Sequence, residues 1–268
     1  MPYFTGKDDT RLFYSDWGTG DPIVFCASQA ISSDLWSSMI ADFNDRGFRC
    51  IAFDRRGHGR SDQPGRGYDM DTLASDIAAL VDKLGLDRVT LIGHSLGGAE
   101  IVRYIGRYGS RKIRRVVLLA ATTPFMTKTA DHPHGVEPTE TEALLASWRV
   151  DFPKWVDDNV LPFFARPVSP ALASWTADLL LRTNLRVILE CAKATMYTDL
   201  RRDLRSFTVP TLVLHGTLDA SVPVAFAQLT ADLIPGCSLE IIEGAAHGLF
   251  LTDRDRVNDS IARFLASE

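Results

Sequence analysis

Short, mostly apolar runs alternate with helical stretches along most of this chain. The runs lie at 22–26, 48–53, 88–92, 115–120, 211–215 and 238–242. Strands without a polar face are typical of parallel sheets whose two sides are both covered by helices. The pattern therefore predicts a mostly parallel sheet, and its connections should be right-handed crossovers.

Between these runs, apolar residues recur at helical spacing. The helical stretches lie at 72–84, 96–108, 223–233 and 253–266. Residues 11–16 instead alternate between polar and apolar side chains, which predicts a strand of an early antiparallel hairpin. The predicted fold class is therefore α/β, with a doubly wound sheet.

The stretch 123–205 interrupts this alternation. It holds several prolines and helical patterns at 141–149 and 178–193, without a convincing strand. We interpret 123–205 as a helical cap that is inserted over the strand ends. Residues 1–122 and 206–268 then form a single core domain.

Composition and charge argue against several other classes of protein. With 268 residues, 46% of them apolar and 24% charged, the chain suits one globular domain that carries an insertion. The net charge of −5 gives no reason to expect nucleic acid or an anionic membrane as a partner. No window is apolar enough to cross a bilayer, and residues 1–21 lack a signal-peptide core, so we expect a cytoplasmic location. A homo-oligomer is compatible with this composition.

The sequence gives no pattern of ligands for a metal ion. The four cysteines are far apart and show no C-x-x-C spacing, so we expect buried, reduced thiols. His132 and His134 flank one proline with no third ligand at a recognisable spacing, and we interpret them as surface residues. We therefore expect neither a metal nor an organic cofactor.

A candidate nucleophile lies between a predicted strand and a predicted helix. Residues 93–97 read Gly-His-Ser-Leu-Gly, a G-x-S-x-G pattern that directly follows the run at 88–92. Glycines two positions to either side of Ser95 allow a sharp turn that exposes the serine hydroxyl at the end of the sheet. The alternatives are a turn that merely packs closely and a phosphate-binding loop, but no Walker-type lysine follows. His94 adjoins the serine, and its side chain should point away.

A serine nucleophile needs a base, and the base needs a group that fixes its tautomer. His247 lies in a loop of small residues between the last predicted strand and the last predicted helix. Asp219 follows the strand at 211–215, so the chain order is Ser, Asp, His. Glu243 is the nearest competing carboxylate, but it precedes the histidine by too few residues to reach round to its ring. An exposed loop histidine and a turn-forming aspartate are the structural alternatives.

Acyl transfer also needs two hydrogen-bond donors for the developing oxyanion. We expect the backbone N–H of Leu96, after the nucleophile, and that of Gln29, after the first buried strand. The side chains of Ser28 and Gln29 should line the same site. Trp148 and Trp155 of the insertion suggest an apolar lid over the substrate, although core packing is the default role of a tryptophan.

Together these residues resemble the α/β-hydrolase fold family, and within it the branch of cofactor-free haloperoxidases, arylesterases and perhydrolases. The similar motifs are residues 53–61, the elbow 93–98 with Glu100 after it, residues 209–212, and His247 with its following glycine. The resemblance implies a mostly parallel, eight-stranded doubly wound sheet with a helical cap insertion. It also implies a Ser95, Asp219 and His247 triad, Gln29 as the second oxyanion donor, and no cofactor.

One segment departs from the family pattern. The family has His-Gly and an aromatic residue after the first buried strand, where this chain reads Ala27-Ser28-Gln29. The backbone donor survives this change, but the pocket wall becomes more polar, which leaves room for lactonase activity.

We expect a serine hydrolase that cleaves a small-molecule carboxylic ester, or a related acyl compound, through an acyl-enzyme. Perhydrolase or haloperoxidase activity could accompany it. The alternatives are a lactonase or another enzyme on this frame, such as an acyltransferase, a lyase or a cofactor-free dioxygenase, and a hydrolase-like receptor that binds a small molecule. A dehalogenase is disfavoured because Ser95 stands where that chemistry needs a carboxylate.

Overall fold

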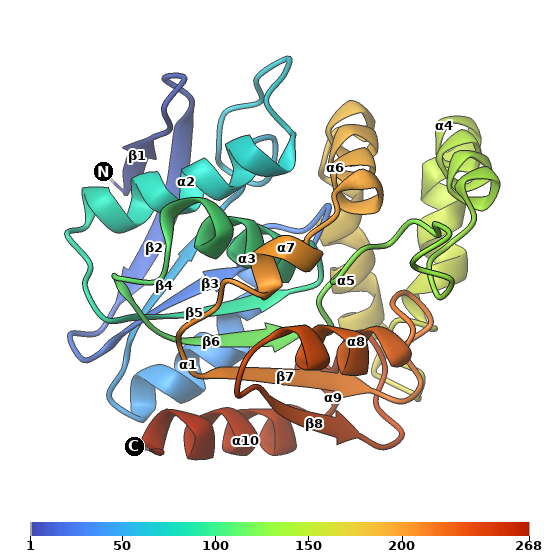
Figure 1. The fold of residues 1–268 in the computed structure, drawn as a ribbon. Helices are drawn as coiled ribbons and strands as arrows, with labels where there is room; N and C mark the ends of the chain where they lie inside the picture. The colour runs from blue at the N-terminus through green and yellow to red at the C-terminus, as the bar shows by residue number, and fades with distance from the viewer. Residues whose placement is uncertain (1, 268) are drawn as a thin grey trace.

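A computed structural model gives the structure of the protein, and it describes residues 2–267. Eight strands form one sheet in the order β1-β2-β4-β3-β5-β6-β7-β8 (Figure 1). Their bounds are β1 Tyr3–Thr5, β2 Arg11–Trp17, β3 Pro22–Cys26, β4 Arg49–Phe53, β5 Val89–His94, β6 Ile113–Leu119, β7 Thr211–Gly216 and β8 Ser238–Ile242. β1, β2 and β4 pair antiparallel, and all other neighbours pair parallel. The predicted mostly parallel, eight-stranded sheet is confirmed.

Side chains that alternate along the strands pack into two separate cores. Val24 and Cys26 of β3 point to one face, which α2 (Met70–Lys83), α3 (Leu96–Tyr108) and α8 (Ala225–Leu233) cover. Ile23 and Phe25 point to the other face, against α1 (Ser37–Asp45) and α10 (Arg254–Ala266). Figure 1 shows the two helical layers on opposite sides of the sheet. Burial on both faces explains why the strand sequences lack a polar side.

Four helices follow β6 and precede β7. They are α4 (Pro138–Val160), α5 (Pro170–Leu181), α6 (Leu185–Tyr197) and the short α7 (Arg201–Leu204). In Figure 1, α4, α5 and α6 stand on the right, beyond the arrowheads of the parallel strands. The helical pattern predicted at 178–193 covers the end of α5 and most of α6, with a break between them that the prediction lacked. The chain turns between α5 and α6, where the Asn184 side chain caps α6 by accepting from the Arg186 N–H at 2.9 Å.

Other local expectations have mixed outcomes. Cys26, Cys50 and Cys191 are buried free thiols, whereas Cys237 is only partly buried. The surface placement of His132 is wrong, because its ring is buried and lies 2.7 Å from the Phe125 carbonyl oxygen through Nε2. Across residues 2–267, no helix has both the length and the apolar character that crossing a bilayer requires.

The turn between β5 and α3 is packed backbone against backbone. A Cβ atom added to Gly97 would lie 2.1 Å from the carbonyl oxygen of Cys26, at the end of β3. No side chain can yield at that contact, because the opposing atoms belong to the main chain. The glycine therefore sets the distance between the turn and the loop that follows β3.

Replacing Gly97 with alanine should lower the free energy of unfolding by about 1–3 kcal/mol, because the methyl group overpacks a rigid contact. Gly65→Ala is the matched control, since Gly65 is exposed and nothing lies within 4 Å of its would-be Cβ atom. That variant should stay within about 0.5 kcal/mol of the wild type. Urea unfolding followed by circular dichroism measures both, and equal stabilities would contradict the packing argument.

Candidate active site

Ser95 occupies a strained turn at the carboxyl end of β5. Its backbone has φ 55° and ψ −120°, a left-handed conformation that is unfavourable for any residue other than glycine. Hydrogen bonds hold it there: its N–H donates to the Leu119 carbonyl at 3.0 Å, and its carbonyl accepts from Gly98 at 3.0 Å and Thr122 at 3.2 Å. Such strain persists only where the surrounding structure enforces it, and it is concentrated at functional sites.

Asp219 and His247 meet at the same edge of the sheet from the loops after β7 and β8. The His247 Nδ1 atom lies 2.8 Å from Oδ2 of Asp219, and both side chains are buried. The other oxygen, Oδ1, accepts from the N–H groups of Ser221 and Val222, each at 2.8 Å. Because an ionised carboxylate only accepts, Nδ1 carries the proton, which leaves Nε2 of His247 free to act as a base.

The environment of Asp219 favours its charged form. Burial by itself would raise the pKa of this carboxyl group, but the charge of His247 and hydrogen bonds from His215 and His247 bring it well below its usual range. Asp219 is therefore an anion at neutral pH, as the orienting group of a histidine base must be. Glu243, the competing carboxylate, is exposed.

His215 is a partner of Asp219 that sequence reasoning missed. Its Nε2 atom lies 2.8 Å from the Val222 carbonyl oxygen and 3.3 Å from Oδ2 of Asp219. The ring thus fixes the turn that carries the aspartate. Its position at the end of β7, four residues before Asp219, was the available signal, but it does not by itself distinguish a neighbour of the carboxylate from a core histidine.

His94 supports the loop of His247 from behind. Its ring is fully buried, its Nε2 atom lies 2.9 Å from the His247 carbonyl oxygen, and the two ring centroids are 4.5 Å apart. Burial, together with repulsion from His247, lowers the pKa of His94 well below its usual range, so it stays neutral. His94 lies outside the pocket lining, in line with the expectation that its side chain points away from the serine.

The two expected oxyanion donors are both unpaired. Neither the N–H of Leu96 nor that of Gln29 donates to another group within residues 2–267. Leu96 begins α3, so its N–H also lies at the positive end of the helix dipole. The Gln29 side chain does have a partner: Nε2 donates to the Ile188 carbonyl of α6 at 3.0 Å.

His58 fixes the next residue of the same loop. The N–H of Ala30 donates to Nε2 of His58 at 3.1 Å, and Nδ1 of His58 lies 2.9 Å from the Arg56 carbonyl oxygen. Both bonds require a neutral ring that is protonated on Nδ1. Burial and the charge of Arg55 lower the pKa of His58 from 6.5 to about 3, so the ring is neutral at physiological pH.

Ser95 and His247 line one pocket of about 360 Å³. Ser28 and Gln29 contribute to its polar side, as expected from the sequence. The helices α4 and α6 contribute most of the apolar wall, and no Asp, Glu, Lys or Arg side chain belongs to the lining among the described residues. The lining residues from α4 and α6 are Leu144, Trp148, Phe152, Trp155, Val156, Asn159, Val160, Ile188, Thr195 and Met196.

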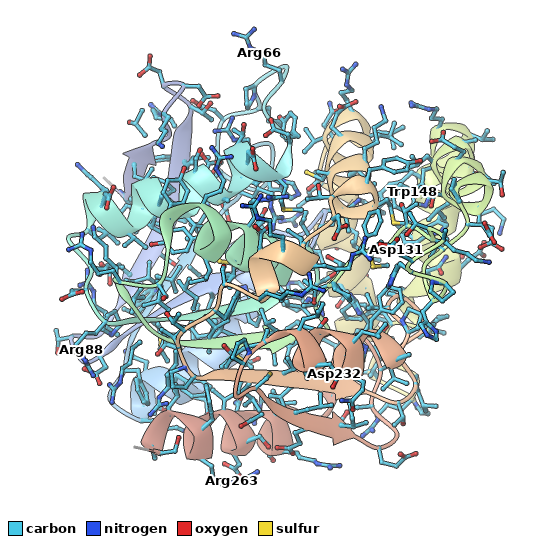
Figure 2. The ribbon with its side chains drawn as sticks, viewed as in Figure 1. Arg66, Arg88, Asp131, Trp148, Asp232 and Arg263 are labelled. Atoms are coloured by element: carbon cyan, nitrogen blue, oxygen red, sulfur yellow. The ribbon has the colours of Figure 1, made fainter. Side chains whose placement is uncertain are left out.

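An aromatic cluster forms the α4 side of this pocket. The rings of Trp148 and Trp155 meet edge to face with centroids 4.9 Å apart, and Phe152 stacks on Trp155 at 5.7 Å. Trp148, labelled in Figure 2, belongs to α4 and lies on the side of that helix that faces α6. The helix departs from regular geometry at Asp151 (φ −155°, ψ 80°), which lets residues on both sides of the break face the pocket.

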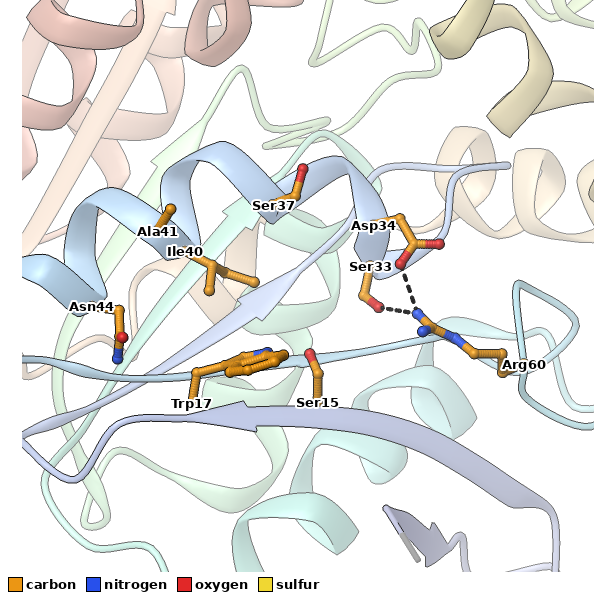
Figure 3. Close-up of a pocket in the computed structure, with 9 residues that line it drawn as sticks. All are labelled: Ser15, Trp17, Ser33, Asp34, Ser37, Ile40, Ala41, Asn44 and Arg60. Atoms are coloured by element: carbon orange, nitrogen blue, oxygen red, sulfur yellow. Dashed lines mark hydrogen bonds and ion pairs between the residues drawn. The ribbon is translucent and has the colours of Figure 1, made fainter.

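A second groove lies beside β2, away from Ser95. It is lined by serines, Trp17 and the ion pair of Arg60 with Asp34, whose atoms lie 2.9 Å apart (Figure 3). No histidine belongs to its lining within the described part of the chain, so it offers no base for a serine. Over residues 2–267, no three His, Cys, Asp or Glu side chains are grouped as metal ligands.

Known proteins resemble this chain over its whole length. A sequence model of the alpha/beta hydrolase fold matches residues 21–203. A non-heme haloperoxidase of Rhodococcus erythropolis is 39% identical over 279 aligned positions, which cover 100% of both chains. A bromoperoxidase from Bacillus anthracis superimposes with a TM-score of 0.94 at 34% identity, over 98% of this chain and 99% of that one. An esterase from Exiguobacterium antarcticum gives a TM-score of 0.96 at 30% identity, over 99% of each chain.

The buried, neutral His58 should make folding sensitive to acid. Below pH 6.5 the unfolded chain binds a proton at this position while the folded chain does not, down to about pH 3. Stability should therefore fall as the pH falls, by at most about 1.4 kcal/mol per pH unit from this ring. The slope of unfolding free energy against pH gives the number of protons taken up on unfolding. His58→Asn should lower that number by up to one, as measured by urea unfolding between pH 6.5 and 4. His134→Asn, at an exposed position, should leave the slope unchanged, and identical slopes for both variants would refute the assignment.

Proposed function

Because this chain belongs to the α/β-hydrolase fold family, we propose that it is a serine hydrolase that cleaves carboxylic esters or related acyl compounds. The observation that carries the proposal is the 2.8 Å contact with Asp219 made by His247, which lines the same pocket as Ser95. The strained backbone of Ser95 also supports its role as the nucleophile. We also propose that residues 123–205 act as the cap that encloses the substrate.

In the proposed reaction, Oγ of Ser95 attacks the carbonyl carbon while Nε2 of His247 accepts the hydroxyl proton. The N–H groups of Gln29 and Leu96 stabilise the negative charge that develops on the carbonyl oxygen. The C–O bond to the alcohol then breaks, and His247 returns the proton to the departing alkoxide. Water attacks the acyl-enzyme in the same way, which releases the acid and restores Ser95.

The pocket favours an uncharged substrate. Its wall is aromatic and aliphatic, and its polar groups are hydroxyls, amides and His247. A carboxylate or ammonium group there would lose its hydration without gaining a partner of opposite charge, which is costly in a site of low polarity. We therefore propose neutral esters with apolar acyl groups, sized to a cavity of about 360 Å³.

Two further activities are compatible with the same site. A relative that is 39% identical is named a non-heme haloperoxidase, which favours perhydrolysis as a side reaction, with hydrogen peroxide replacing water at the acyl-enzyme. The polar side chains of Ser28 and Gln29 in the lining favour the opening of lactones. Both reactions would use the same serine.

A fluorophosphonate probe tests the nucleophile directly. It should label the folded wild type at Ser95, Ser95→Ala should not react, and His247→Gln should react at least about 100-fold more slowly because the base is missing. Ser37→Ala, in the exposed groove of Figure 3, is the control and should label normally. Labelled peptides are identified by mass spectrometry. If the folded wild type does not react, the alternative of a hydrolase-like receptor that binds a small molecule would be favoured over an enzyme.

A pair of esters of matched length tests the substrate class. 4-Nitrophenyl hexanoate should be hydrolysed with a kcat/KM at least about 100-fold above that of mono-4-nitrophenyl adipate, because only the latter places a carboxylate in the apolar pocket. Release of nitrophenolate measures both rates, and hydroxide hydrolysis of each ester corrects for intrinsic reactivity. Equal corrected rates would rule out selection by the uncharged lining.

A further inference from the structure

The loop that carries the Gln29 N–H is held from behind by a buried arginine. Nη2 of Arg55 donates to the Ala27 carbonyl at 2.6 Å, and Nη1 donates to the Ser28 carbonyl at 2.9 Å. Arg55 is only 3% exposed and is absent from the pocket lining, so it does not face the substrate. One planar guanidinium thus binds the two peptide carbonyls that directly precede the N–H of Gln29.

The same guanidinium is bonded to the helix that begins at the nucleophile. Glu100 lies on the second turn of α3, and its carboxylate accepts from Nε and Nη2 of Arg55, the latter at 2.9 Å. The pair is fully buried. Leu96, which carries the other free N–H, is the first residue of α3. Arg55 therefore connects the backbone segments of both donors through a single rigid group.

The backbone of Ala30, the next residue of the loop, is also engaged. The Ala30 N–H donates to His58, and the Ala30 carbonyl accepts from Oγ1 of Thr183 at 2.9 Å. Ala30 itself has a left-handed backbone with φ 64°, a conformation that alanine rarely adopts. The N–H of Gln29 has no hydrogen-bond acceptor of its own among the described residues. Its direction is therefore set by the bonds that hold the neighbouring residues of the loop.

We propose that Arg55 is a positioning residue of the oxyanion hole, which holds the N–H of Gln29 in register with the N–H of Leu96. The proposal rests on the proposed hydrolase function. Such donors accelerate acyl transfer only when they are fixed before the reaction, because reorienting them during the reaction removes their advantage. Arginine suits this task because its rigid, planar fork of donors binds two carbonyls and a carboxylate at once.

A purely structural role is the competing explanation. A buried ion pair can often be replaced by apolar residues of similar volume without loss of stability, so burial does not by itself reveal what the pair does. The two explanations differ in what they predict for kinetics. A structural role changes stability, whereas a positioning role lowers kcat in folded enzyme with little change in KM.

Arg55→Lys is the first test, because lysine keeps the charge opposite Glu100 but cannot bind both loop carbonyls. We expect kcat for a neutral nitrophenyl ester to fall by about 10- to 100-fold, less than the 10²–10³ that follows removal of a whole donor. KM should change less than about threefold, since ground-state binding does not use the oxyanion donors. Inhibition by butylboronic acid, whose tetrahedral adduct with Ser95 places an oxygen in the oxyanion hole, should weaken by the same factor as kcat/KM.

Arg56→Lys is the matched control. Arg56 is the adjacent residue and is equally buried, but it pairs with Asp76 and Asp8 and makes no side-chain contact with residues 27–30. It should lose stability without losing kcat. If Arg55→Lys does not fold, the double variant R55M/E100M removes both charges together, and its folded fraction should still show the loss of kcat.

The outcomes separate this proposal from the proposed function. A folded Arg55 variant with wild-type kcat and wild-type affinity for the boronic acid would overturn the positioning role and leave the hydrolase intact. A wild type that neither hydrolyses esters nor reacts with fluorophosphonate would instead remove the hydrolase, and the positioning role with it. Loss of kcat in Arg56→Lys equal to that in Arg55→Lys would also count against a specific role for Arg55.

Discussion

Parallel pairing of β3, β5, β6, β7 and β8 is the constraint on which the proposed site depends. Cys26 pairs with Gly93, His94 with Leu119, and Gly216 with Ile242, so the strands end in step along one edge. Neighbouring strands lie only about 4.8 Å apart. Loops that are more than a hundred residues apart in sequence therefore begin within a few strand spacings of each other. The hydrogen-bonded sheet, rather than local sequence, brings the serine, the aspartate and the histidine together.

Buried histidines hold the loops at this edge of the sheet through hydrogen bonds. His94, His215 and His58 are all buried, and each bonds a main-chain carbonyl through one ring nitrogen. A buried histidine is costly unless it is neutral and hydrogen-bonded, so these contacts allow the rings to remain in the interior. These hydrogen bonds also fix the loops that carry His247, Asp219 and the proposed oxyanion donor. The interior supports the site with hydrogen bonds as well as with apolar packing.

The sequence predicted the features that depend on local pattern. Apolar runs identified the strands, and the glycines around Ser95 identified the turn, because periodicity and backbone freedom are local properties. Three features escaped prediction, one because its local signal is weak and two because they depend on tertiary partners. The break before Asn184 was missed because a single capping residue ends one helix and starts another within a pattern that is otherwise helical. His132 is buried by residues that are distant in sequence. The roles of Arg55 and His215 depend on which main-chain carbonyls lie next to their side chains. The triad and the cap boundaries 123–205 remain proposals that the geometry supports.

The loop after β3 is bonded both to residues beside the sheet and to the helices between β6 and β7. Arg55 binds the carbonyls of Ala27 and Ser28. On the other side, Gln29 donates to Ile188 of α6, and Thr183 donates to Ala30. A phenylalanine at position 29, one of the aromatic residues that the family resemblance implies there, would have no donor for the side-chain bond to α6. The polar residue at this position therefore does more than alter the pocket wall. It connects α6, which lines the pocket of Ser95, to the peptide that carries the proposed oxyanion donor, so under the proposed function a shift of α6 that accommodates a different acyl group would also move that donor. In such an arrangement, substrate fit and transition-state stabilisation are coupled through one amide side chain.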